Sequence, residues 1–171
     1  IAFYRLFFTT ILLIPLLLLR KKTRHELRTL PKTTVLIMIV IGIILAAHFA
    51  LWISSLKMTS VASSVILVTA HPVLVAPVSF YFLKEKLSLI NALGIAISLG
   101  GVGLLVIGNY GFAAFGLDTL EGNILALLGG IAAGLYILGG RTLRKTVSTI
   151  TYAFVVYAVG TIVLFIMCLT L

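Results

Sequence analysis

The chain has 171 residues, of which 61% are hydrophobic and only 10% are charged, and its mean hydropathy is +1.26. A soluble globular domain is about half apolar and about one quarter charged, so this composition excludes a water-soluble fold. A membrane helix needs roughly 20 apolar residues, so the length accommodates about six or seven crossings. The net charge of +9 does not indicate nucleic-acid binding, because the charged residues stand between the apolar runs.

Long apolar runs predict six transmembrane helices. They cover residues 1 to 19, 34 to 54, 61 to 83, 88 to 108, 122 to 140 and 149 to 171. Backbone polar groups in lipid must be satisfied within the segment, which leaves helices or closed barrels, and these runs are too long and continuous for barrel strands. The expected fold class is therefore all-α, a polytopic transmembrane helix bundle.

The loops between the runs differ sharply in charge. Consecutive spans alternate in direction, so the loops fall into two sets: 20 to 33, 84 to 87 and 141 to 148 on one side, 55 to 60 and 109 to 121 on the other. Of the 13 lysines and arginines, the second set holds only Lys57. The positive-inside rule predicts a multi-pass protein of the cell membrane with the basic loops cytoplasmic. Because residue 1 then lies outside and is not Met, we expect a fragment that lacks at least one upstream span.

A cluster of lysines and arginines lies between residues 20 and 32. We favour membrane topology as its explanation. A patch that binds anionic lipid headgroups is the rival explanation, since four to eight juxtamembrane basic residues suffice for it. We expect an aromatic belt at the two membrane interfaces, with Trp52 and Tyr110 near the outer boundary and Tyr81 near the inner one. Anchoring is the main role expected of these three side chains.

No aspartate or glutamate lies within any predicted span. This argues against intramembrane aspartyl proteases and carboxylate-bridged metal enzymes, and it removes the commonest proton carrier. Cys168 stands alone in an apolar run, so neither a disulfide framework nor a cysteine metal cluster is expected. We therefore expect no metal, no cofactor and no enzymatic activity.

Polar side chains inside the spans are the candidates for substrate contact, because such groups are costly in lipid. Arg5 lies about one turn inside the first span, where it either snorkels to the headgroups or contacts an anion at the outer mouth of a cavity. His48 and Trp52 are four residues apart and share a helix face. His48, and His71 near the middle of the third span, are each expected to line a cavity or to bond a neighbouring helix.

Two prolines predict a kink in the third span. Pro72 and Pro77 each free the carbonyl four residues earlier, which is that of Val68 in the first case. Freed carbonyls at midspan are tolerated only where protein or a water-filled cavity satisfies them. Ser64 lies seven residues before His71 and so shares its face. The alternative is a purely structural kink whose serines bond back to their own helix.

Glycines recur in the fourth and fifth predicted spans. They are Gly94, Gly101 and Gly108, then Gly122, Gly129, Gly130 and Gly134. Small residues let helix backbones approach closely in lipid, so both sets are expected to be packing faces.

The stretch from Leu56 to Gly108 resembles the EamA-domain branch of the drug/metabolite transporter superfamily. It contains, in the order that family shows, a small-residue entry to a helix, a midspan proline, a Glu-Lys-Leu turn and a glycine-rich helix. Arg5 and the run GNILALLGGIAAGLYILGGR also look like that family. The likeness covers nearly the whole chain.

The resemblance implies a ten-helix protein made of two inverted five-helix repeats. Residues 1–108 would be helices two to five of the first repeat, 109–121 an extracytoplasmic loop, and 122–171 the first two helices of the second repeat. An odd number of spans per repeat forces the inversion. A faint internal echo agrees, because an Ala-Phe pair and a bulky, Tyr-containing run occur both near residue 2 and near residue 153.

The function implied is transport of a small organic metabolite or drug-like solute by alternating access, as an exporter. The resemblance makes His48, Trp52, Ser64 and His71 the candidate substrate contacts, and Arg5 joins them from its position. The expected partners are a small-molecule substrate and membrane lipids, with no nucleic acid. The alternative is a membrane-embedded enzyme or a structural multi-span subunit acting on lipids, which needs a polar catalytic cluster at one interface.

Overall fold

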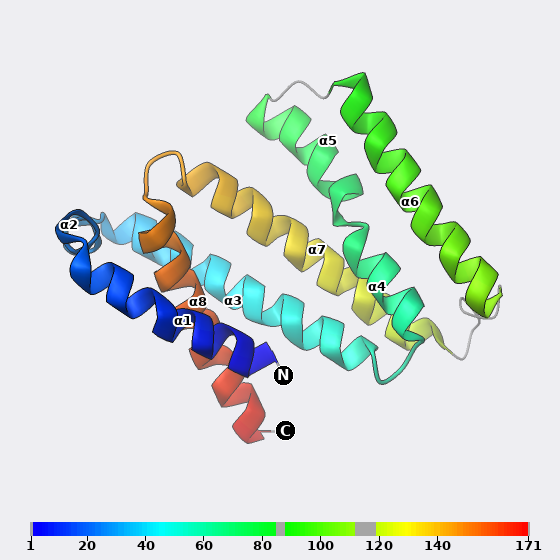
Figure 1. Cartoon of the computed structure of the whole chain (residues 1–171), viewed down its shortest axis with the longest axis horizontal. Coiled ribbons are helices and arrows are strands. Elements are labelled where there is room, and N and C mark those ends of the chain that lie inside the picture. The colour runs from blue at the N-terminus through cyan, green and yellow to red at the C-terminus, as the bar shows by residue number, and fades with distance from the viewer. Residues whose placement is uncertain (1, 85–87, 112–118, 171) are drawn as a thin grey trace. The chain divides into compact units, whose positions relative to one another are not determined.

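The computed structural model describes residues 2–84, 88–111 and 119–170, and helices account for almost all of them (Figure 1). The helices are α1 (Ala2–Leu19), α2 (Lys21–Thr29), α3 (Lys32–Ser55), α4 (Val61–Thr69), α5 (His71–Leu83), α6 (Leu89–Tyr110), α7 (Leu120–Leu143) and α8 (Thr149–Thr170). The described residues contain no strand, so the expected all-α class is confirmed. Glu85, Lys86 and Asp118 lie outside the described residues.

Five segments in the described ranges are long and apolar enough to cross a membrane. They are Ala2–Leu19, Lys32–Ser55, Val61–Tyr81, Leu120–Leu143 and Thr149–Leu169. The fourth predicted span, 88 to 108, coincides with α6, whose apolar stretch Leu89–Gly101 is shorter by the same criterion. The protein is therefore a polytopic helix bundle, and its helices follow the hydropathy of the sequence closely.

The third predicted span is broken at Ala70, which confirms the expected kink. Ala70 separates α4 from α5, and its φ and ψ of −68° and −1° do not continue an α-helix. Pro72 stands in the first turn of α5, where the N–H groups of a helix have no partner within that helix. The N–H of Val73 bonds the carbonyl of Ala70 at 3.0 Å, three residues back. Pro77 lies inside α5 without interrupting it.

The largest difference from the sequence prediction is α2. The segment 20 to 33 was expected to be a loop, yet nine of its residues form a helix. Hydropathy could not detect this helix, because α2 is strongly polar and its ordering depends on a contact with a distant part of the chain, described below.

The chain divides into two compact units, residues 1–47 with 135–171 and residues 48–134. In the first unit, α1 and α8 lie side by side and run in opposite directions. The ring of Phe3, near the start of α1, is 5.6 Å from that of Phe165, near the end of α8. The hydroxyls of Thr10 and Thr161 are 3.4 Å apart. A Cβ atom at Gly160 would lie 2.9 Å from a methyl group of Leu6, so the absence of a side chain there permits this contact.

In the second unit, the glycines of α7 are packing positions, as predicted. A Cβ atom at Gly122 would lie 2.6 Å from the backbone of Met58, and one at Gly130 would lie 2.9 Å from the carbonyl oxygen of Leu67. At Gly134 the nearest atom is a methyl group of Val75 at 3.2 Å. These glycines let α7 approach the backbone of its neighbours.

The glycines of α6 do not follow the prediction. At Gly94, Gly101 and Gly108 a Cβ atom would meet nothing within 4 Å among the described residues. The same small-residue pattern therefore marks a close contact in α7 and an open face in α6. Small side chains permit close approach but do not select a partner.

Candidate functional site

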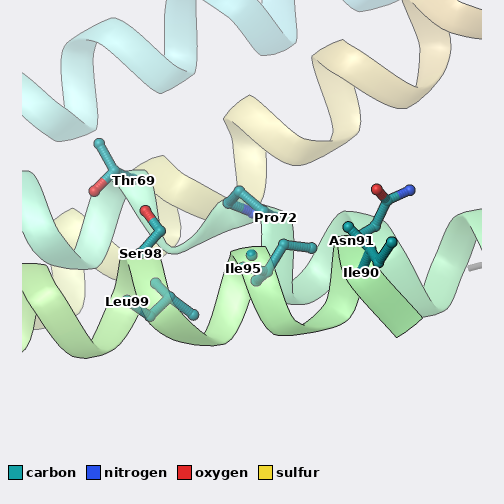
Figure 2. A pocket seen from close by; sticks show the side chains of 8 residues that line it. Thr69, Pro72, Ile90, Asn91, Ile95, Ser98 and Leu99 are labelled. Carbon is teal, nitrogen blue, oxygen red and sulfur yellow. The ribbon is translucent and has the colours of Figure 1, made fainter. Parts of the chain in front are cut away.

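A hollow of about 440 Å³ lies where the α4–α5 break faces α6. Figure 2 shows Thr69 and Pro72 of the broken helix on one side, and Asn91 and Ser98 of α6 on the other. The remaining lining residues are Ile90, Gly94, Ile95 and Leu99. The volume falls within the usual range for a small-molecule pocket, and a mainly apolar wall with a few polar groups is the usual composition of one.

The polar groups of this hollow are uncharged. The hydroxyl of Thr69 donates to the carbonyl of Val65 at 2.7 Å, so its oxygen retains lone pairs that can accept a hydrogen bond. Asn91 and Ser98 provide an amide and a second hydroxyl. Among the described residues that line it, none is ionisable. The hollow can therefore hydrogen-bond a solute but cannot neutralise a net charge.

His71 stabilises the helix break from the other side. Its Nδ1 lies 3.1 Å from the carbonyl oxygen of Val68 and must donate, because a carbonyl only accepts. This carbonyl is the one that Pro72 deprives of its helical partner. The Cβ of His71 would lie 3.9 Å from a Cβ atom at Gly134, so the residue faces α7. His71 therefore supports the break, and the lining of the hollow comes from its neighbours.

His48 and Trp52 form a stacked pair near the end of α3. Their rings are 5.9 Å apart with an interplanar angle of 19°, which agrees with the shared helix face predicted from their spacing. The Nδ1 of His48 donates to the carbonyl of Gly129 at 2.9 Å, so this histidine bonds a neighbouring helix. The indole Nε1 of Trp52 is buried and has no hydrogen-bond partner among the described residues. A buried donor without a partner is rare and calls for an explanation.

Ser64 is connected to Trp52 by two consecutive hydrogen bonds through Ser55. The Ser55 hydroxyl donates to the carbonyl of Trp52 at 2.6 Å, so its single hydrogen is used. The hydroxyl of Ser64, 2.6 Å away, must then be the donor to Ser55. Ser64 thus bonds another helix rather than its own. Three of the five predicted contact residues, His48, Trp52 and Ser64, therefore lie around the last two turns of α3.

Arg5 lies on an exposed face of α1, in the other unit. The hydroxyl of Thr9 donates to the backbone carbonyl of Arg5 at 2.7 Å, as their separation of one turn allows. Tyr81 is exposed near the end of α5, and the side chain of Tyr110 lies outside the described residues.

A polar cluster around Asn123 was missed from the sequence. The side-chain oxygen of Asn123 accepts hydrogen bonds from the hydroxyls of Thr59 and Ser63, both at 2.8 Å, and its amide donates to Thr119. Ser60 caps α4 by accepting from the N–H of Ser63. Asn123 fastens the start of α4 to the start of α7. No local signal could identify it, because its partners are about sixty residues away.

A second polar site fastens α2 to α8. The carboxylate of Glu26 accepts from the N–H of Ser148 at 2.8 Å, from the hydroxyl of Ser148 at 2.5 Å and from that of Thr151 at 2.6 Å. Ser148 directly precedes α8, so the carboxylate caps the amino-terminal end of that helix. Burial raises the pKa of Glu26, but the hydrogen bonds from Ser148 and Thr151 and the charge of Lys22 outweigh it and hold the pKa below its ordinary 4.5. The helix α2 and the start of α8 therefore meet at one end of the first unit.

The model of the EamA-like transporter family matches residues 1–107, which include α1 to α5 and most of α6. The chain belongs to the EamA-like transporter family. This EamA protein therefore carries several apolar spanning helices within a family of membrane transporters, which makes it an integral, multi-pass membrane protein. No curated protein and no solved structure matches it significantly.

Proposed function

We propose that this EamA protein is part of a secondary transporter that exports a small organic metabolite or drug-like solute by alternating access. The observation that carries the proposal is the break at Ala70, which faces the hollow lined by Thr69, Pro72, Asn91 and Ser98. Discontinuous membrane helices form the binding sites of many transporters, because irregular backbone at that depth is tolerated where it lines a cavity.

The chemistry of the hollow favours an uncharged or internally neutralised solute. An ion would lose its hydration shell against a wall without a counter-charge, which is strongly unfavourable. Thr69, Asn91 and Ser98 would orient the solute through hydrogen bonds, and the isoleucines would bury its apolar part. We also propose His48, Trp52, Ser64 and His71 as contacts of the same pathway, with the indole N–H of Trp52 as the available donor.

The contact between α1 and α8 supports the inverted repeat. The Ala-Phe echo sets residue 2 against residue 153, and the same offset of 151 residues sets Thr10 against Thr161. These two equivalent residues are the ones whose hydroxyls meet, at 3.4 Å. Each donates at 2.7 Å to the carbonyl four residues before it, which repeats the local geometry. Equivalent residues of two related elements touch only near a two-fold axis, so we place the axis between the two repeats at this pair.

The unit formed by residues 1–47 and 135–171 also supports the proposed orientation. Glu26 and Ser148 bring the two basic segments, 20 to 33 and 141 to 148, to one end. We propose that this end is cytoplasmic and that the protein resides in the cell membrane, by the positive-inside rule. We also propose that the protein is not an enzyme and that Arg5 contacts solute at the outer mouth. Hydrolysis or transfer of lipid by the purified protein would instead support a membrane enzyme.

Transport by the full-length protein in vesicles tests the proposal, with a panel of neutral, anionic and cationic metabolites. For the transported solute, Asn91→Ala and Ser98→Ala should each raise KM roughly fivefold, as expected for about 1 kcal/mol per lost hydrogen bond. Gly101→Ala is the matched control on the same helix, because its added methyl group meets nothing within 4 Å among the described residues. Unchanged KM in both variants, at normal abundance in the membrane, would remove the hollow from the transport pathway.

A further inference from the structure

One face of α2 collects basic side chains. Lys21, Arg24, His25 and Arg28 are spaced so that they form a single stripe along the helix, and together they line a surface hollow of about 280 Å³. All four side chains are exposed. Like charges at these spacings destabilise an isolated helix. The stripe therefore presents an unfavourable concentration of positive charge that a bound anion would relieve.

The opposite face of α2 is fixed to the protein. Thr23 is buried, and Glu26 holds the amino-terminal end of α8 through three hydrogen bonds. At 3.6 residues per turn, Thr23 and Glu26 lie on the side opposite the basic stripe. The helix cannot rotate about its axis without breaking those bonds. The stripe therefore faces away from α8 in a defined direction.

The connections of α2 keep it at the membrane surface. Only Arg20 separates α2 from α1, and only Leu30 and Pro31 separate it from α3. The 18 residues of α1 make a helix about 27 Å long, close to the thickness of the hydrocarbon core. A connection of one or two residues extends only about 3 to 7 Å, so α2 lies within the headgroup layer.

We propose that the basic stripe of Lys21, Arg24, His25 and Arg28 is a binding surface for the phosphate groups of anionic phospholipids. Arg24 and Arg28 can each bind a phosphodiester with two parallel hydrogen bonds, and Lys21 adds a point charge. The topology rule alone requires only that lysines and arginines lie in this loop. It does not require that three of the four lysines and arginines of α2, together with His25, share one face. Only Lys22 lies off this stripe, on the side where the carboxylate of Glu26 holds α8. That segregation points to a ligand, and the surface on which α2 lies supplies it.

The experiment uses the full-length protein, purified in detergent, and measures its affinity for phosphatidylglycerol and for phosphatidylcholine. The test variant carries Lys21→Gln, Arg24→Gln and Arg28→Gln. The control carries Lys32→Gln, Arg141→Gln and Lys145→Gln, which remove the same charge from the same end of the protein but leave the stripe intact. We expect the wild type and the control to prefer phosphatidylglycerol. The test variant should lose affinity by about fivefold per cation, on the order of a hundredfold in total.

Three results would overturn the proposal. They are an unchanged preference in the test variant, an equal loss in the control, and displacement of the lipid by inorganic phosphate at similar concentration, which would indicate a site for soluble anions. If the test variant does not fold, Arg28→Gln alone should still weaken phosphatidylglycerol binding about fivefold. Binding by Arg28→Gln that equals that of the wild type would likewise contradict the lipid surface.

Discussion

Replacing Glu26 with glutamine should weaken the attachment of α2 to α8. Glutamine has the same shape but no charge, and its amide nitrogen cannot accept a hydrogen bond. The carboxylate accepts three hydrogen bonds, two of them on the oxygen Oε2, from Ser148 and Thr151. Hydrogen bonds to a charged group contribute about 1.5–3 kcal/mol, and neutral ones about 0.5–1.5 kcal/mol. The lost charge also faces a helix N-terminus, which favours it by about 0.3–1 kcal/mol.

From these contributions, Glu26→Gln should lower the free energy of unfolding by about 1–2 kcal/mol at neutral pH. The assay is thermal or denaturant unfolding of the purified protein in detergent, with Glu121→Gln as the control. Glu121 is an exposed acid in the first turn of α7, where its charge also faces a helix N-terminus, so its replacement should lower stability by only about 0.3–1 kcal/mol.

The same substitution should remove part of the pH dependence of stability. Because the folded-state pKa of Glu26 lies below its ordinary 4.5, its ionisation stabilises the folded state fully above that value. This stabilisation is lost as the pH falls from 4.5 through the lower folded-state pKa. Wild type and Glu26→Gln should therefore converge in stability in acid. Equal stability at neutral pH, or a parallel decline in acid, would refute the capping role.

Two further predictions concern helix packing. Gly130→Ala should destabilise the protein by about 1–3 kcal/mol, because the new methyl group would lie 2.9 Å from the carbonyl oxygen of Leu67. The control is Gly101→Ala, whose methyl group would meet nothing within 4 Å among the described residues. It should leave the midpoint of thermal unfolding unchanged or raise it. With Cys168 replaced by alanine, Thr10→Cys and Thr161→Cys should form a disulfide on mild oxidation, since their hydroxyls are 3.4 Å apart. Failure of the thiols to cross-link would contradict the antiparallel pairing of α1 and α8.

Most of the fold could be predicted because a segment that spans lipid must be apolar and must satisfy its own backbone hydrogen bonds, which makes it a helix. The continuous apolar runs predicted the ends of α1, α3, α7 and α8 to within about three residues. Pro72 indicated the break at Ala70. The helix α2 could not be predicted in this way. Its sequence is polar, and it is anchored by Glu26 to Ser148, 122 residues further along the chain.

The candidate site was predicted only in part. The pairing of His48 with Trp52 followed from helical spacing, which is a local property. The role of His71 did not follow, because a histidine beside a proline has the same spacing whether it lines a cavity or bonds the freed carbonyl of Val68. Asn91 carried no signal at all. Asn91 lines the hollow only because α6 packs beside the broken helix, and that contact depends on tertiary structure.

The most direct test of the central claim, that solute binds in the hollow at the helix break, is protection of a cysteine placed there. In the full-length protein with Cys168 replaced, Ser98→Cys on the wall of the hollow is compared with Gly101→Cys on the same helix outside it. The transported solute should slow thiol labelling of Ser98→Cys and leave that of Gly101→Cys unchanged. Equal labelling of Ser98→Cys with and without a solute that is still transported would show that transport does not use this hollow.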